Sequence, residues 1–115
     1  RGVNNIVKWV LGASTWTLIA GDSSGSHGSS STLLYSPRGV ILDPLGNIYV
    51  ADTLNHRIQF FLAGQTNGTT VAGVTGLSGS TDLLLNVPYA VRLDSDNSLY
   101  VADTYNHRIQ KFTSY

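Results

Sequence analysis

The sequence predicts an all-β fold made of repeated antiparallel sheets, and three observations support this. The eleven residues from Tyr49 to Gln59 recur as Tyr100 to Gln110 with ten identities, which shows an internal repeat. All seven acidic residues are Asp and twelve residues are Gly, a composition that favours tight turns over helices. Continuous apolar runs such as 48–51 suit strands that are buried on both faces.

The repeat has a period of 51 residues over most of its length. This offset relates Pro37 to Pro88 and Asp43 to Asp94. A degraded copy at the start has an offset of 52, relating Ile6 to Ile58. We therefore treat the chain as one segment, 1–115, with a partial unit at 1–21, a full unit at 33–73 and a partial unit at 84–113.

Each unit holds strand-like runs between turn signals, and no helix is predicted. In the full unit the four expected strands are 39–43, 47–52, 57–62 and 69–73. A four-stranded unit of about 50 residues with two apolar faces is what a β-propeller blade requires, because each blade packs between two neighbours. The whole chain then has nine strands. They are the third and fourth strands of the first unit, all four strands of the second unit, and the first three strands of the third unit.

The repeat residues also resemble a known family, the NHL-repeat β-propellers. Its pattern is matched by Pro37, Gly39-Val40, Asp43, Gly46 through Asp52 and Asn55 through Gln59. The later copy departs from the pattern at Ala90 and at 97–99. The resemblance implies that the strand 39–43 is innermost, that the strand 69–73 is outermost, and that a complete ring has six blades.

About two blades cannot close a ring, and their outer faces would expose apolar surface. Closure requires either a longer chain or several copies, and three copies of two blades give six. We favour assembly, so the chain itself is an expected partner in a homotrimer. The ninth strand is surplus in that arrangement.

Charge and composition exclude several classes of function. Seven basic and seven acidic residues cancel, which argues against nucleic-acid binding. No apolar run is long enough to span a membrane, and the absence of Cys excludes disulfides and thiol catalysis. No cofactor is expected. The low charge and the glycosylation sequon at Asn67 point towards an extracellular setting.

Residues that recur at equivalent positions are expected to serve the fold, because a single functional site rarely needs them twice. They are Asp52, His56, Arg57, Asp103, His107 and Arg108. We expect the Asp residues to cap turns and pair with a basic side chain, and the His residues to hold the turns. No Ser has a setting that would activate it, the three His lack metal-ligand spacing, and the segment 94–98 is expected to be a turn instead of a calcium loop.

Positions that differ between the copies are better candidates for binding. In the alignment of the two copies Tyr89 takes the position of Arg38, Tyr105 that of Leu54, and Arg92 that of Ile41. Positions 38, 89, 54 and 105 should share the end of the blades where, by the resemblance, propeller ligands dock. Tyr and Arg are effective anchors at interfaces. Arg92 is expected to line the channel or to pair with an Asp between blades.

The function that best fits these observations is a non-enzymatic binding or assembly module that presents propeller-face loops to a protein or glycan. One alternative is RNA binding, as in some NHL propellers, although the basic residues here are scattered. A second alternative is a metal-dependent enzyme similar to the propeller lyase that finishes peptide amidation, although its ligands cannot be mapped onto this chain.

Overall fold

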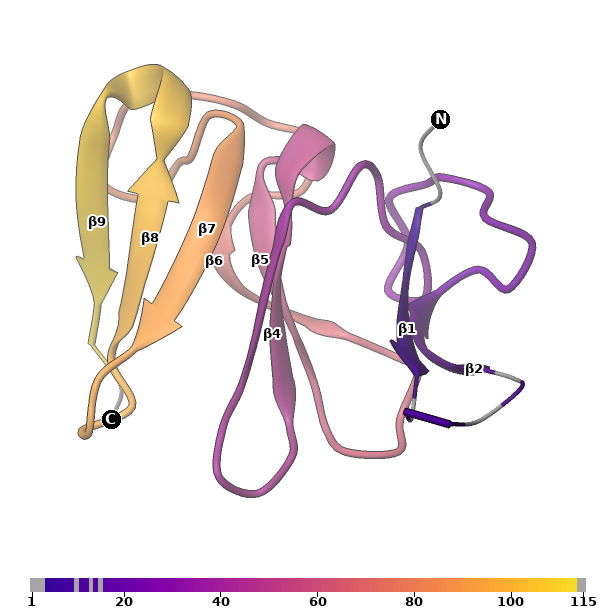
Figure 1. The fold of residues 1–115 in the computed structure, drawn as a ribbon. Coiled ribbons are helices and arrows are strands. Elements are labelled where there is room, and N and C mark those ends of the chain that lie inside the picture. The colour runs from indigo at the N-terminus through magenta and orange to yellow at the C-terminus, as the bar shows by residue number, and fades with distance from the viewer. Residues whose placement is uncertain (1–3, 10, 13, 15, 114–115) are drawn as a thin grey trace.

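The computed structural model describes residues 4–9, 11–12, 14 and 16–113, which form three antiparallel sheets standing side by side (Figure 1). The first sheet pairs β1 (Asn5–Trp9) with β2 (Trp16–Gly21). The second has the order β3 (Gly39–Leu42), β4 (Ile48–Asp52), β5 (Arg57–Phe61) and β6 (Thr69–Gly73). The third consists of β7 (Pro88–Leu93), β8 (Leu99–Asp103) and β9 (Arg108–Phe112).

The strands of the second sheet lie within one residue of their predicted bounds, and all nine predicted strands are present. The expectation of no helix needs one correction. A single 3-10 turn, η1 (Thr53–Asn55), connects β4 to β5, and η2 (Thr104–Asn106) connects β8 to β9. Each ends at a His in the left-handed region, His56 at φ 56° and His107 at φ 55°. This conformation reverses the chain within a few residues.

Aspartate side chains shape the turns at the opposite end of the sheets. Asp43 Oδ1 accepts hydrogen bonds from the N–H groups of Leu45 and Asn47, both at 3.0 Å. Asp94 Oδ1 does the same for Asp96 at 2.9 Å and Ser98 at 3.0 Å. The segment 94–98 is therefore a turn organised by its own carboxylate.

The partial repeat at the start follows the same register as the full one. Ile6 pairs with Ala20 as Ile58 pairs with Ala72, and a bulge follows Ile6 just as one follows Ile58. Gly21 ends β2 at φ 88°, and a Cβ there would lie 2.5 Å from the carbonyl oxygen of Asn4. β1 and β2 are thus the third and fourth strands of a blade.

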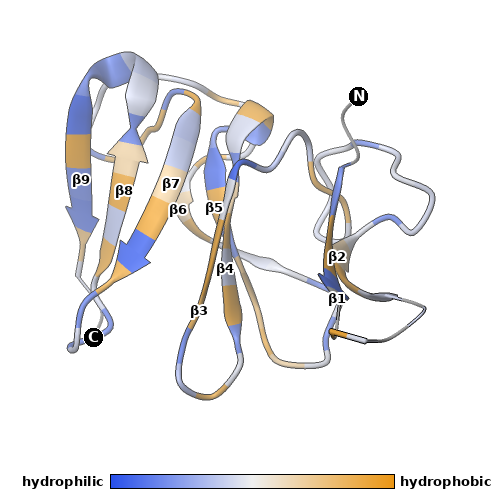
Figure 2. Ribbon diagram, viewed as in Figure 1, coloured by the Kyte–Doolittle hydropathy of each residue, from blue (hydrophilic) through white to orange (hydrophobic). Residues whose placement is uncertain are grey.

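Apolar side chains pack between the sheets in two clusters, and apolar stretches follow the strands (Figure 2). Between the first and second sheets the buried members are Ala20, Leu34, Ile48, Val50 and Phe61. Between the second and third sheets they are Ala51, Ile58, Ala72, Leu85, Val91, Leu99 and Val101. The second sheet is therefore buried on both faces, as a propeller blade must be. Among the described residues no helix is long and apolar enough to cross a membrane.

Candidate binding surface at one end of the sheets

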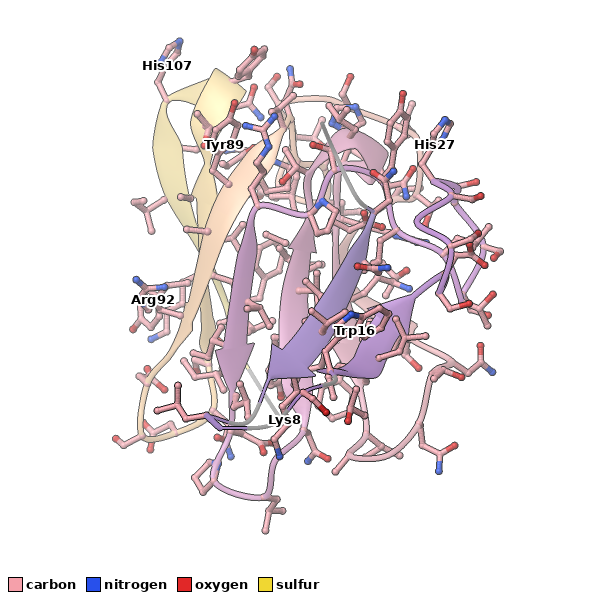
Figure 3. All side chains as sticks on the ribbon, turned by 45° about the vertical axis from the view of Figure 1, so that its right-hand side comes forward. Lys8, Trp16, His27, Tyr89, Arg92 and His107 are labelled. Atoms are coloured by element: carbon pink, nitrogen blue, oxygen red, sulfur yellow. The ribbon has the colours of Figure 1, made fainter. Side chains whose placement is uncertain are left out.

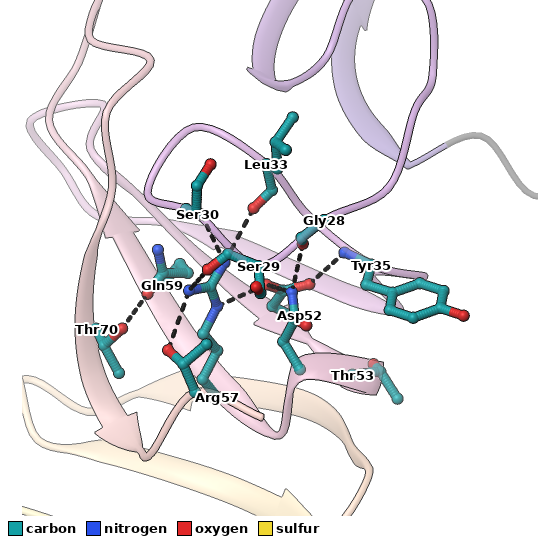
Figure 4. Close-up of polar contacts among 12 residues, drawn as sticks. Gly28, Ser29, Ser30, Leu33, Tyr35, Asp52, Thr53, Arg57, Gln59 and Thr70 are labelled. Atoms are coloured by element: carbon teal, nitrogen blue, oxygen red, sulfur yellow. Dashed lines mark hydrogen bonds and ion pairs between the residues drawn. The ribbon is translucent and has the colours of Figure 1, made fainter. Parts of the chain in front are cut away.

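A buried carboxylate at the end of β4 organises the loop that enters the second sheet (Figure 4). Asp52 is fully buried. Its Oδ1 accepts the N–H of Tyr35 at 2.7 Å, and its Oδ2 accepts Asn55 Nδ2 at 2.9 Å and Arg57 Nε at 2.7 Å. The carboxylate thus holds both the η1 turn and the incoming loop.

Arg57 extends this contact to the loop before β3. Its Nη1 donates to the carbonyl of Ser29 at 3.0 Å and to Oγ1 of Thr75 at 3.1 Å. Its Nη2 donates to the carbonyls of Ser30 at 3.0 Å and Leu33 at 2.9 Å. The Arg57 side chain is only 3% exposed, so these partners, and not water, stabilise its charge. We call Asp52, Asn55 and Arg57 with their contacts the clamp.

The third sheet repeats the clamp. Asp103 Oδ2 accepts Arg108 Nε at 2.7 Å and Asn106 Nδ2 at 2.8 Å. Arg108 in turn donates to the carbonyls of Ser80, Thr81 and Leu84. All four recurring charged residues are therefore placed in loop-holding contacts, which leaves their carboxylates and guanidinium groups committed to the fold.

Neighbouring sheets are joined by hydrogen bonds from the same turn. Nδ1 of His56 accepts the N–H of Val87 at 3.0 Å, and Oγ1 of Thr53 donates to the carbonyl of Pro88 at 2.7 Å. Burial lowers the pKa of His56, and the Asp103 carboxylate opposes part of that shift. Between the first and second sheets the equivalent bond has Asn4 Oδ1 as acceptor and the Ser36 N–H as donor, at 2.7 Å.

The predicted binding positions 38, 54, 89 and 105 lie at the end of the sheets that carries η1 and η2. Arg38 and Tyr89 come from different sheets, and the guanidinium carbon lies 5.1 Å from the ring centroid. Tyr105, in η2, is 60% exposed, and Leu54, in η1, is also exposed. We call this surface, formed by Tyr35, Arg38, Leu54, Tyr89 and Tyr105, the η end; Tyr89 is labelled there in Figure 3.

Sequence reasoning missed Tyr35 of this surface and His27, which packs against it. His27 stacks on Tyr35 with ring centroids 4.2 Å apart and an interplanar angle of 14°. The carbonyl of Tyr35 also accepts the N–H of Leu54 at 3.1 Å, which ties the incoming loop to η1. The low-complexity segment around His27 gave no periodic signal, and the stacking arises only when the clamp brings this loop back over the sheet.

Two other predicted residues lie away from the η end. Arg92 stands on β7, below Tyr89 in Figure 3, and its Nη1 donates to the carbonyl of Val91 at 3.0 Å. Asn67 is exposed in the loop between β5 and β6, where its Oδ1 accepts a hydrogen bond from Ser31 Oγ.

One serine-containing segment follows β2. Residues 21–25 read Gly-Asp-Ser-Ser-Gly, which matches the letters of a hydrolase nucleophile elbow. That elbow joins a strand to a helix, whereas this segment leaves β2 for an irregular loop. The serine at the nucleophile position of the pattern is Ser23. Its neighbour Ser24 donates its hydroxyl to Asp22 and is the main cause that lowers the pKa of this carboxyl. Among the described residues no group of three or more His or Asp side chains could hold a metal ion.

The repeats match a known family. The NHL repeat matches residues 34–61 and 85–112. The chain carries NHL repeats. The chain is 40% identical over 84 residues to NHL repeat-containing protein 2 of Bos taurus and 39% identical over 85 residues to that of Homo sapiens. Each alignment covers 67% of this chain and 12% of the relative, so this NHL segment spans only a small part of the relatives' length.

Solved structures share the fold at low sequence identity. An auxiliary nutrient binding protein from Bacteroides thetaiotaomicron superposes with a TM-score of 0.72 and 22% identity. One from Bacteroides ovatus gives 0.71 and 20%. Each superposition covers 96% of this chain and 32% of the other. The NHL chain therefore has a β-propeller-like fold of about two blades, which fits a binding or assembly module.

Proposed function

We propose that this NHL segment is a non-enzymatic binding module and that its η end docks a protein or glycan partner. The observation that carries the proposal is the Arg38–Tyr89 contact, which joins two blades into one exposed surface beside Leu54 and Tyr105. Tyr and Arg are enriched at the energetic centres of interfaces, because they bring large contact area together with polar groups.

The support under this surface is rigid. The clamps hold the incoming loops at both blades, and the exposed side chains stand on η1, η2 and the first residues of the inner strands. A partner would meet a surface that is already ordered, which lowers the entropic cost of binding. The two Bacteroides proteins are nutrient binding proteins, and those nutrients are ligands of those proteins alone. The partner of this chain has to be found by experiment.

Capture experiments test the proposal. The chain is immobilised through its C-terminus and incubated with a library of glycans and with a fraction of extracellular proteins. The double variant Arg38→Ala/Tyr105→Ala is treated in the same way. A matched control, Leu45→Ala, removes an exposed side chain from the turn at the opposite end. We expect a partner that binds the unchanged chain and the control and is lost from the double variant.

Three results would contradict the proposal. Equal loss in the control would mean that binding does not use the η end. Binding of single-stranded RNA that weakens steeply with salt, or stoichiometric uptake of zinc or calcium with activity, would favour the RNA-binding or enzymatic alternative instead.

We further propose that additional copies of the chain complete the propeller ring, and that three copies do so. The support is the length of the propeller-like neighbours, of which one copy covers 32%.

A further inference from the structure

We infer that the partner at the η end is an acidic protein segment. One Asp or Glu carboxylate of that segment binds the guanidinium of Arg38, and apolar side chains next to it pack on Leu54 and Tyr105. This inference rests on the proposed function and names the class of partner that the η end takes. The residues that carry it belong to the second and third sheets, which pack directly against each other.

Arg38 is the charged residue of the η end. Its side chain is exposed, whereas the other four residues of this surface are Tyr or Leu. In the part of the chain that the structure describes, the ion pairs are those of the two clamps, Asp52 with Arg57 and Asp103 with Arg108. No carboxylate among these residues therefore pairs with Arg38, and its positive charge is left for a ligand.

Three contacts hold Arg38 in one place before any ligand arrives. Its main-chain N–H donates to the carbonyl of Ala51 at 3.1 Å, and its Nε donates to Ser36 Oγ at 3.3 Å. The guanidinium carbon lies 5.1 Å from the centroid of the Tyr89 ring. With Nε engaged, the two Nη groups remain as donors, and their spacing matches the two oxygens of a carboxylate. An ordered guanidinium also loses less entropy on binding.

The surroundings of the guanidinium suit a protein side chain with apolar neighbours. The Tyr89 ring covers part of the cation, which reduces its contact with water and strengthens its attraction to an anion. Leu54, on the second sheet, is 39% exposed, and Tyr105, on the third sheet, is 60% exposed. A segment whose carboxylate binds Arg38 can therefore place apolar side chains on both blades, and aromatic anchors of this kind contribute strongly to interfaces.

The polar groups of the η end favour a protein over a glycan. Sugar hydroxyls donate as well as accept, so a sugar site needs carboxylate or amide oxygens as acceptors. The carboxylates beneath this surface, Asp52 and Asp103, are fully buried, and each already accepts a hydrogen bond from the amide of Asn55 or Asn106. The side chains that remain are three phenols, one Leu and Arg38, which only donates. Apolar side chains of a protein need no acceptors.

A single guanidinium also favours a carboxylate over phosphate groups. Nucleic acids are bound through several cations, and phosphorylated motifs are recognised by clusters of Arg. Arg57 and Arg108 are held in the clamps, and Lys111 pairs with Tyr100 near the turns at the opposite end of the sheets. One isolated cation beside apolar surface matches one carboxylate beside apolar side chains.

Peptide selection tests the class of ligand. The full chain is immobilised and used to select from a phage-displayed library of random peptides. We expect the selected peptides to share an Asp or Glu with apolar residues close to it. Selected peptides that need the η end but lack an acid, or a glycan captured there with no peptide selected, would overturn this inference and leave the proposed function standing. Peptides or glycans that bind Arg38→Ala/Tyr105→Ala as well as the unchanged chain would overturn both.

A double-mutant cycle then tests the contact at Arg38. A selected peptide and its variant with Asn for Asp, or Gln for Glu, are titrated by fluorescence anisotropy against the unchanged chain and Arg38→Gln. The amide should bind the unchanged chain about tenfold or more weakly, because a charged hydrogen-bonded pair is lost. Against Arg38→Gln the two peptides should differ by less than about twofold. An equal difference against both chains would overturn the inference.

Two further variants separate the fork from the charge. Arg38→Lys keeps the positive charge but cannot form the bidentate pair, so it should recover at most part of the affinity, and full affinity would overturn the bidentate contact. The matched control is Lys111→Gln, which removes a cation that lies 5.6 Å from the centroid of the Tyr100 ring. It should bind the acidic peptide as the unchanged chain does, and an equal loss there would overturn the assignment to Arg38.

Discussion

Replacing Arg57 with Met should destabilise the chain far more than the same replacement at Arg108. Arg57→Met keeps most of the apolar stem but leaves the buried Asp52 without the cation that lies 2.7 Å away. Removing one partner of a buried ion pair costs about 3–5 kcal/mol. Arg108 is 26% exposed against 3% for Arg57, so water can reach the site in Arg108→Met, and we expect about 1–3 kcal/mol there.

Urea unfolding followed by circular dichroism, at one fixed chain concentration, measures both losses. The double variant Asp52→Asn/Arg57→Met supplies the control, since a neutral amide removes the stranded charge and should recover part of the loss. Equal losses for the two Arg variants, or a loss for Arg57→Met within about 0.5 kcal/mol of zero, would refute the assignment of the clamp as a buried, charge-dependent contact.

Two further perturbations probe the junction between the second and third sheets. Gly39→Ala should cost about 1–3 kcal/mol in a urea titration, because the added Cβ would lie 2.8 Å from the Tyr89 carbonyl oxygen; an unchanged midpoint would contradict this close approach. The pKa of His56 is lowered in the folded chain. The hydrogen bond from the Val87 N–H to His56 should therefore contribute fully to the free energy of unfolding above pH 6.5, and this contribution should be lost as the pH falls through the lowered pKa. Unfolding titrations on either side of pH 6.5 check this sign.

The pH test has an internal control. His107 occupies the same left-handed turn position but faces no further sheet within the described residues of one chain. His56→Gln should therefore flatten the pH dependence of unfolding, and it should do so more than His107→Gln does. Flattening by the two variants to the same extent would contradict the assignment to the His56–Val87 link.

The strands could be predicted from the sequence because turn residues punctuate them at fixed offsets. Asp43 and Gly46 mark one turn, and the 51-residue offset predicts the equivalent turn in the third sheet, where Asp94 is kept and Asn97 replaces Gly46. The alignment of Ile6 with Ile58 is confirmed by their equivalent pairing and bulges. The propeller class followed from apolar runs on both faces of one unit, and the structure bears it out.

The partners of the repeat side chains could not be predicted. Arg57 donates to backbone carbonyls more than twenty residues earlier, and carbonyls are present at every position, so they leave no pattern in the sequence. The hydrogen bond that His56 accepts from the Val87 N–H of the next sheet could not be predicted for the same reason, because every residue except Pro has an N–H group. The binding role of the η end residues stays a prediction, because exposure shows where a partner could bind but not which one.

The clamp also sets the boundary of the unit that should open and close cooperatively. Hydrogen bonds from Asn55 to the carbonyl of Gly28 and from Arg57 to those of Ser29 and Leu33 make the loop before β3 part of the sheet that follows it. Slow hydrogen exchange should thus extend from about residue 28 through β6 to Gly76, whose N–H donates to the carbonyl of Asn55, and the segment from about residue 79 should exchange at the rate of the third sheet. A gene duplication whose copied segment began inside a blade would separate a clamp from the loop that it holds. A copied segment that began just before this loop would contain a complete folding unit.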